Sequence, residues 1–83
     1  MKQLLFFTAN WCPSCQTTKP IVEQLQKTRT IPVQIIDTDY DGSLTTQYGV
    51  RSIPTLILLE NGTEKKRTTG ALRYEQLNQF ING

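Results

Sequence analysis

The sequence Trp11-Cys12-Pro13-Ser14-Cys15 stands where two different patterns of apolar residues meet. Before it, Lys2 to Thr8 is a short run of large apolar residues without alternation, which is typical of a strand covered on both faces. After it, the spacing becomes that of one helix face, carried by Thr18, Ile21, Val22 and Leu25. Pro13 suits a first helical turn, because its missing N–H would have no partner there. The pentapeptide is therefore predicted to join a strand to a helix.

This position gives the two cysteines their chemistry. Cys12 lies at the N-terminus of the predicted helix, where unpaired N–H groups and the positive end of the helix dipole favour thiolate over thiol. Thiolate is the attacking species in disulfide exchange. Cys15 follows one helical turn later on the same face, so it can reach a mixed disulfide formed at Cys12 and resolve it. Ser14 either hydrogen-bonds the thiolate or is an ordinary serine at a helix start, and its position fits both.

Three other roles for Cys12 and Cys15 are less favoured. A disulfide that closes so short a loop adds little stability, because the stabilisation grows with loop length. A structural zinc ion needs four ligands, and the sequence has no histidine and no third cysteine, so only a metal site shared between two chains remains open. Burial of both as inert core residues fits poorly with the polar helix start around Pro13 and Ser14. A resident metal is therefore not expected.

The remainder of the chain predicts three more strands and two more helices. In order, these are a second buried strand over Val33 to Ile36, a short helix from Ser43, a strand over Thr55 to Leu59, a return strand from about Glu64 to Thr69, and a final helix after Gly70. Asn61-Gly62 is the two-residue loop preferred by tight hairpins. Because strand–helix–strand crossovers are right-handed, the first two strands are predicted to be parallel. The prediction is one α/β domain over residues 1–83, with a four-stranded mixed sheet (two strands parallel, two antiparallel) flanked by three helices.

Composition excludes several classes of protein. The apolar fraction of 37% and the charged fraction of 19% are too hydrophobic and too weakly charged for a disordered segment. A net charge of +2 is nearly balanced, so no nucleic-acid partner is expected, and Lys65-Lys66-Arg67 is interpreted as a solvated strand edge. No apolar stretch approaches the roughly 20 residues of a membrane span, and the run after Met1-Lys2 is too short for a signal peptide. We therefore expect a complete, monomeric cytoplasmic protein.

Taken together, the motifs resemble those of the thioredoxin family over nearly the whole chain. Trp11 to Cys15 resembles the family's Trp-Cys-x-x-Cys motif, and Pro20 matches its helix-kinking proline. The segment Tyr48 to Thr55 is similar to the one that carries the family's cis-proline. Asn61-Gly62 and Gly70-Ala71-Leu72 fall where the family has its hairpin turn and a glycine of the substrate groove. The combination is specific, whereas a lone Cys-x-x-Cys would not be.

The resemblance implies a binding site for an extended peptide beside the cysteines. It implies that the Ile53-Pro54 bond is cis, so that Ile53 presents its N–H and C=O to a substrate next to Cys12. Trp11, Ile53 and Gly70 would then line a shallow apolar groove that binds the peptide like a strand. The residues alone leave another role open for Pro54, that of a proline at the start of a strand. Trp11, taken alone, fits core packing equally well.

Two departures from the thioredoxin pattern change what is expected. Thioredoxins begin with an extra strand and helix that this chain lacks, so the sheet should have four strands, as in the smaller glutaredoxins, with Val33 to Asp37 as an exposed edge. Thioredoxins also carry a buried aspartate six positions before the first cysteine, paired with a lysine on the next strand. The corresponding residues here are Phe6 and Ile35, both apolar. The usual proton acceptor for Cys15 is therefore absent, and water, a substrate group or Ser14 takes that role, or Cys15 attacks more slowly.

The resemblance implies a small cytosolic dithiol–disulfide oxidoreductase that reduces protein disulfides. Cys12 would be the nucleophile and Cys15 the resolving thiol, with no cofactor beyond the redox-active Cys12–Cys15 disulfide. A thioredoxin reductase is the expected electron donor, and glutathione, as in glutaredoxin-like proteins, is the alternative. Two further alternatives stay open: a thioredoxin-like module that binds a partner or senses redox state without turnover, and an oxidase if the chain is exported.

Overall fold

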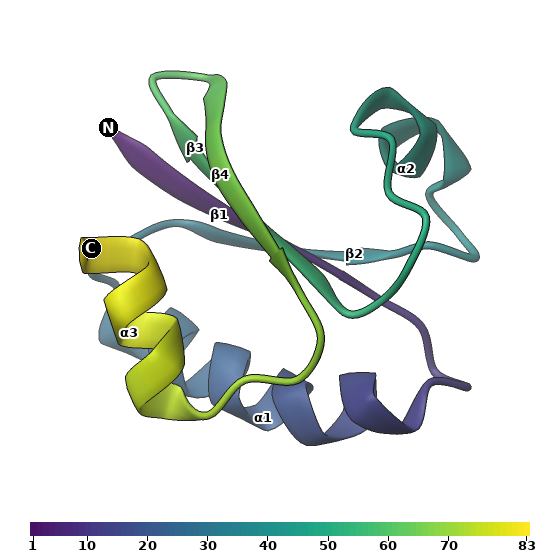
Figure 1. Ribbon diagram of the computed structural model, residues 1–83, viewed down its shortest axis with the longest axis horizontal. Helices are drawn as coiled ribbons and strands as arrows, with labels where there is room; N and C mark the ends of the chain where they lie inside the picture. The colour runs from purple at the N-terminus through teal and green to yellow at the C-terminus, as the bar shows by residue number, and fades with distance from the viewer.

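The computed structural model describes residues 1–83 and contains four strands and three helices. In chain order these are β1 (Lys2–Thr8), α1 (Pro13–Thr28), β2 (Val33–Asp37), α2 (Gly42–Gln47), β3 (Thr55–Glu60), β4 (Thr63–Thr69) and α3 (Tyr74–Asn82). The strands form one mixed sheet in the order β2-β1-β3-β4 (Figure 1). β1 runs parallel to β2 and antiparallel to β3, and β3 runs antiparallel to β4. The predicted fold class, element order and strand directions are confirmed.

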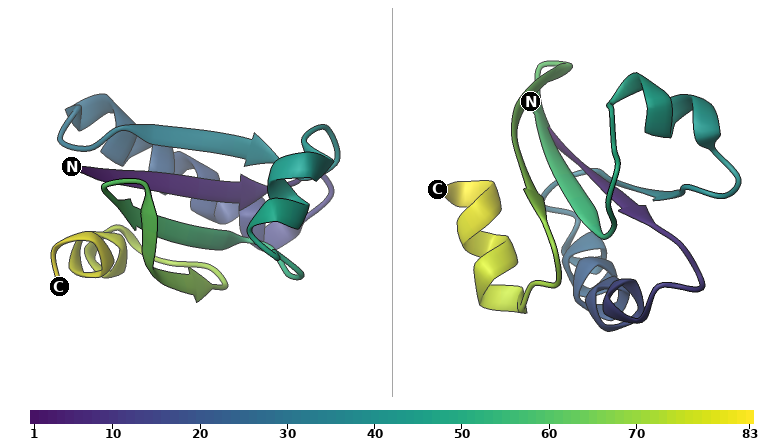
Figure 2. Two further views of the ribbon diagram at one scale, coloured as in Figure 1. Left: turned by 90° about the horizontal axis from the view of Figure 1, so that it is seen from above. Right: turned by 45° about the vertical axis from the view of Figure 1, so that its right-hand side comes forward.

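Helices cover both faces of the sheet. α1 and α3 lie against one face, and α2 lies over the other, next to the ends of β1 and β2 (Figure 1, Figure 2). Because side chains alternate along a strand, β1 contributes to both cores: Leu4 and Phe6 pack with α1 and α3, whereas Leu5 and Phe7 pack on the α2 side. All four side chains are buried, and burial of each stabilises the fold by about 1.5–3 kcal/mol. The unbroken apolar sequence of β1 thus reflects its central place in the sheet.

β2 is an edge strand that is buried at one end only. It pairs with β1 alone, and Ile36 is buried while Gln34 is exposed. The prediction that Val33 to Ile36 is a buried strand is therefore right for Ile36, wrong for Gln34 and only partly met by Val33 and Ile35, which are half-buried. The reason is that α2 lies near the Ile36 end of the strand and leaves the other end uncovered (Figure 2). The sequence also predicted that Val33 to Asp37 forms an exposed edge of the sheet, and this is confirmed by the position of β2.

A tight turn joins β3 to β4. Asn61 and Gly62 have φ values of 54° and 83°, the two positive angles that a two-residue hairpin turn needs. β4 forms the other edge of the sheet and carries the basic run Lys65-Lys66-Arg67. Each of these three side chains has a polar partner within the chain: Glu60, the Gly83 carbonyl and Glu64, respectively. The basic run is accounted for as a charged strand edge.

α1 carries the cysteines and has well-defined ends. It begins at Pro13, as predicted, and continues through Pro20 to Thr28. It ends at Arg29, whose left-handed backbone (φ 56°) lets its amide donate to the Gln26 carbonyl at 3.2 Å. None of the three helices combines the length and the apolar composition needed to cross a membrane.

Candidate active site

Cys12 ends the loop between β1 and α1 and caps the helix. Its backbone is extended (φ −95°, ψ 111°), and its sulfur accepts a hydrogen bond from the Cys15 amide at 3.2 Å. Ala9 holds the loop, because its carbonyl accepts from the Cys12 amide at 3.3 Å and from the Gln16 side chain at 3.1 Å. Pro13, which follows, is exposed in the first turn. The Cys12 sulfur therefore lies at the positive end of α1, as the sequence predicted.

The surroundings of Cys12 favour its thiolate. Burial is the largest single influence and raises the pKa of Cys12, but hydrogen bonds from Cys15 and Ser14 together outweigh it and lower that pKa. The Ser14 hydroxyl lies 3.5 Å from the Cys12 sulfur, so the structure has Ser14 in contact with the thiol rather than turned away. Cys12 is only 4% exposed, so a partner must approach it through a small part of its surface.

Cys15 lies one helical turn beyond Cys12 and is fully buried. Burial, the largest cause, and the hydrogen bond with Cys12 raise the pKa of Cys15, while the Ala9 backbone and the Thr8 hydroxyl lower it by less. Both thiols are free, and they ionise in order, Cys12 before Cys15. A more acidic thiol that a partner can reach, with a less acidic and fully buried thiol behind it, is an arrangement suited to thiol–disulfide exchange.

The loop before β3 faces the Cys12 sulfur. The Ile53-Pro54 bond is cis, as expected, and the Ile53 carbonyl accepts a hydrogen bond from the Cys12 thiol across 3.8 Å. Pro54 is fully buried, and its carbonyl accepts from the Gly70 amide at 2.8 Å. Gly70 has a φ of 103°, a conformation that residues with a side chain rarely adopt. The backbone next to Cys12 is therefore held in place through Pro54 and Gly70.

A hollow of about 150 Å³ lies between Trp11 and Ile53. Four further residues line it: Thr38, Thr45, Val50 and Arg51. Trp11 is 68% exposed, and its indole N–H donates to the Asp39 carboxylate at 3.0 Å, so it is a surface residue and not part of the core. Trp11 and Ile53 thus both line this hollow, and the peptide-binding groove that the resemblance implies stays a prediction. Gly70 was expected in the same groove, but it does not line the hollow and instead bonds to Pro54.

Sequence reasoning missed two residues of this region, Asp39 and Thr8. Asp39 follows the end of β2, and because β1 and β2 are parallel, the loops after both strands meet at one edge of the sheet. That relation could have placed Asp39 near Trp11. Thr8 is the last residue of β1 and is two positions beyond Phe6, so strand alternation puts it on the same face as Phe6, toward α1.

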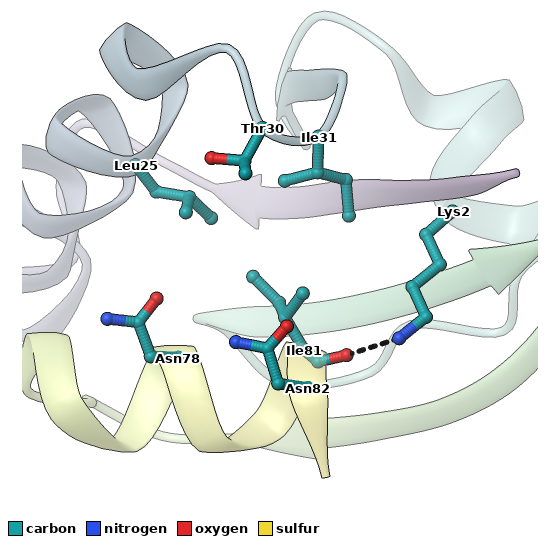
Figure 3. Close-up of a pocket in the computed structure, with 7 residues that line it drawn as sticks. All are labelled: Lys2, Leu25, Thr30, Ile31, Asn78, Ile81 and Asn82. Carbon is teal, nitrogen blue, oxygen red and sulfur yellow. Dashed lines mark hydrogen bonds between the residues drawn. The ribbon is translucent and has the colours of Figure 1, made fainter.

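A second hollow, of about 130 Å³, lies at the other end of β1. It is lined by residues of β1, α1, α3 and the loop after α1, and the Lys2 ammonium donates to the Ile81 carbonyl there at 2.9 Å (Figure 3). β1 begins at Lys2 and ends at Thr8, so this hollow and the cysteines lie beyond opposite ends of the strand. It takes no part in the candidate active site.

Comparison with known proteins gives one consistent result. The family model described as Thioredoxin matches residues 1–83. A thioredoxin of Haemophilus influenzae is 41% identical over 81 residues, which are 95% of this chain and 76% of the relative. A thioredoxin of Rickettsia bellii is 33% identical over 81 residues, 95% of this chain and 77% of the relative. Among solved structures, a mutant thioredoxin from Halobacterium salinarum superposes with a TM-score of 0.91 at 34% identity, covering 98% of this chain and 72% of that one.

Proposed function

The chain belongs to the thioredoxin family and is a protein-disulfide oxidoreductase, and from that premise we propose that it reduces protein disulfides in the cytosol by thiol–disulfide exchange. The observation that carries the proposal is the ordered pair of thiols. The Cys15 amide donates to the Cys12 sulfur at 3.2 Å, and the pKa of Cys12 is lowered while that of Cys15 is raised. The reducing direction suits a compartment that keeps dithiols reduced, which is why we propose the cytosol.

In the proposed reaction the protein dithiol supplies both electrons. The Cys12 thiolate attacks one sulfur of a substrate disulfide; the Cys12–substrate bond forms, the substrate S–S bond breaks, and the leaving sulfur takes up a proton. Cys15 then attacks the Cys12 sulfur, which forms the Cys12–Cys15 disulfide and releases the second substrate thiol. No cofactor takes part, and the new disulfide must be reduced before another turnover.

Thioredoxins act on disulfide-containing proteins, and we propose such proteins as the substrates. An extended segment beside the substrate disulfide would pair with the backbone of Ile53, which already lies 3.8 Å from the Cys12 sulfur. A neighbouring substrate side chain would enter the hollow between Trp11 and Ile53. Backbone pairing of this kind tolerates many sequences, so a broad range of substrates is expected.

We propose a thioredoxin reductase as the electron donor. The segment Thr55-Leu56-Ile57 and the turn Thr69-Gly70-Ala71-Leu72 support this proposal, because both are closer to the thioredoxin pattern than to the glutaredoxin one. Glutathione is the second candidate, and both are addressed by one experiment.

Insulin reduction, followed by turbidity, is run in two parallel reactions. One contains thioredoxin reductase and NADPH, and the other contains glutathione, glutathione reductase and NADPH. We expect turbidity in the first reaction only, and its loss with Cys12→Ser. Turbidity in the second reaction only would identify a glutathione-dependent reductase. No turbidity in either reaction would contradict the reductase proposal and favour a binding or redox-sensing module.

A further inference from the structure

Cys15 has to form a thiolate inside the core before it can resolve a mixed disulfide. It is fully buried, and burial opposes the charged form of a thiol. Phe6, on the face of β1 that packs against α1, is also fully buried and offers no polar atom. The reacting sulfur therefore needs a hydrogen-bond donor from another residue.

Thr8 is the residue placed to supply it. Along β1, Leu4 and Phe6 face α1, and alternation puts Thr8 on the same face at the end of the strand nearest the cysteines. Thr8 is 5% exposed, and its Oγ1 is the one buried side-chain oxygen of the chain that has no hydrogen-bond partner. An unpartnered buried hydroxyl is uncommon in folded proteins and calls for an explanation.

Two other buried threonines show how unusual this is. The Thr18 hydroxyl donates to the Ser14 carbonyl at 2.9 Å, and the Thr55 hydroxyl donates to the Ser52 carbonyl at 2.6 Å. Both of these hydroxyls use their proton in a hydrogen bond to a backbone carbonyl oxygen. Thr8 keeps its proton free at the end of β1 nearest the cysteines, on the strand face that packs against α1, the helix that carries Cys15.

We propose that Thr8 is a catalytic residue whose hydroxyl donates a hydrogen bond to the Cys15 sulfur as that sulfur becomes the attacking thiolate. The inference rests on the proposed exchange reaction. In that step the Cys15–Cys12 bond forms, the Cys12–substrate bond breaks, and the electron pair leaves on the substrate sulfur. The proton lost by Cys15 ends on that sulfur, so Thr8 stabilises the thiolate without being consumed.

The ionisation of Cys15 agrees with this role. Burial and Cys12 raise the pKa of Cys15, and the groups that act in the opposite direction are the Ala9 backbone and the Thr8 hydroxyl. Cys12 is the ionisable group that acts on Cys15, both through their hydrogen bond and through its charge. Once Cys12 is bonded to a substrate its charge is gone, and the unpartnered Thr8 hydroxyl remains available to Cys15.

The test separates the two thiols in time. Reduced protein is mixed with dithiobis(nitrobenzoate), a chromogenic aromatic disulfide, and release of nitrothiobenzoate is followed by stopped flow. The first release reports attack by Cys12 and the second reports resolution by Cys15. For Thr8→Val, which keeps the shape and removes the hydroxyl, we expect an unchanged first release. We expect the second release to slow about three- to tenfold near neutral pH, because a hydrogen bond to a charged group is lost while the less stabilised thiolate is intrinsically more nucleophilic.

The pH profile distinguishes a lost hydrogen bond from a damaged fold. The profile of the second release should shift to higher pH in Thr8→Val, and at its alkaline end, where Cys15 is ionised in both proteins, the variant should be at least as fast as wild type. Thr8→Ser, which retains a hydroxyl, should recover most of the rate. Thr18→Val, the matched loss of a buried threonine hydroxyl, should leave the second release unchanged.

Each other outcome overturns an identifiable claim. A second release in Thr8→Val with the wild-type rate and pH profile overturns the role of Thr8 and leaves the exchange reaction intact. Slowing of both releases at every pH, or equal slowing in Thr18→Val, also overturns it, since the effect would then be structural. A wild-type protein that releases no second nitrothiobenzoate overturns the exchange proposal itself.

Discussion

The indole N–H of Trp11 donates to the carboxylate of Asp39, 28 positions along the chain, across 3.0 Å. This bond joins the loop after β1 to the loop after β2 and holds an aromatic ring that is 68% exposed. A ring this exposed has little packing to orient it, so the bond to Asp39 is what fixes its direction beside Cys12.

Asp39→Ala should therefore free Trp11 without unfolding the protein. Because both groups are at the surface, we expect the free energy of unfolding to change by no more than about 0.5 kcal/mol. Trp11 is the only tryptophan, so time-resolved fluorescence anisotropy reports it directly, and a faster component should appear. Asp39→Asn keeps an acceptor oxygen and should restore most of the wild-type decay. An identical decay in wild type and Asp39→Ala would show that the bond does not orient the ring.

Ser14→Ala should make Cys12 a weaker nucleophile at neutral pH. The Ser14 hydroxyl, 3.5 Å from the Cys12 sulfur, is one of the groups that lower the pKa of Cys12. A lowered pKa means more thiolate at a given pH, so removal of the hydroxyl moves the ionisation of Cys12 to higher pH. We expect the rate of alkylation by iodoacetamide below that pKa to fall about two- to fivefold, with the midpoint of its pH profile shifted upward.

Thr17→Ala is the control for Ser14→Ala. The Thr17 hydroxyl lies in the same turn but donates to the Ser14 carbonyl at 2.9 Å and makes no hydrogen bond to Cys12. Its removal should leave the alkylation profile unchanged. Equal midpoints in all three proteins would make Ser14 an ordinary residue of the helix start.

The parts of the fold that the sequence predicted are those fixed by neighbouring residues. β1 has the bounds that its apolar run predicted, Lys2–Thr8, because a central strand buries both faces. α1 begins at Pro13, and the turn at Asn61-Gly62 lies where its residue types predicted, because each depends on local backbone preferences. The thiol pair follows from the same logic, since its spacing and its helix start are both local.

The parts that could not be predicted depend on which segments meet. The exposure of Gln34 depends on how far α2 extends over β2, and apolar periodicity contains no such information. The irregular register between Leu58 and Leu59 depends on the pairing of β3 with β4. The position of Thr8 relative to Cys15 likewise depends on how α1 packs on the sheet. A buried threonine at a strand end has no sequence signature that separates it from an ordinary strand residue.

The two glycines Gly62 and Gly42 should respond in opposite ways to replacement by alanine. Gly62 has a φ of 83°, so Gly62→Ala should destabilise the protein by about 1 kcal/mol although a Cβ would meet no atom within 4 Å. Gly42 begins α2 without a positive φ and has the same free space, so Gly42→Ala should stabilise by up to about 1 kcal/mol. Urea denaturation measures both. Equal effects of the two replacements would mean that backbone conformation does not govern the hairpin turn.

Cys15→Ser should convert the protein from a turnover catalyst into a trap. The proposed reaction passes through a disulfide between Cys12 and the substrate, and only Cys15 is placed to break it from within the chain. With Cys15 replaced, Cys12 can still attack, so covalent complexes with disulfide-containing proteins should accumulate and be identified by mass spectrometry after non-reducing separation. Adding Cys12→Ser should abolish every complex, whereas Lys65→Ala, at the β4 edge where Lys65 pairs with Glu60, should keep full insulin-reducing activity. A folded Cys15→Ser protein that traps nothing would mean that Cys12 does not attack disulfides, and the chain would then act through binding alone.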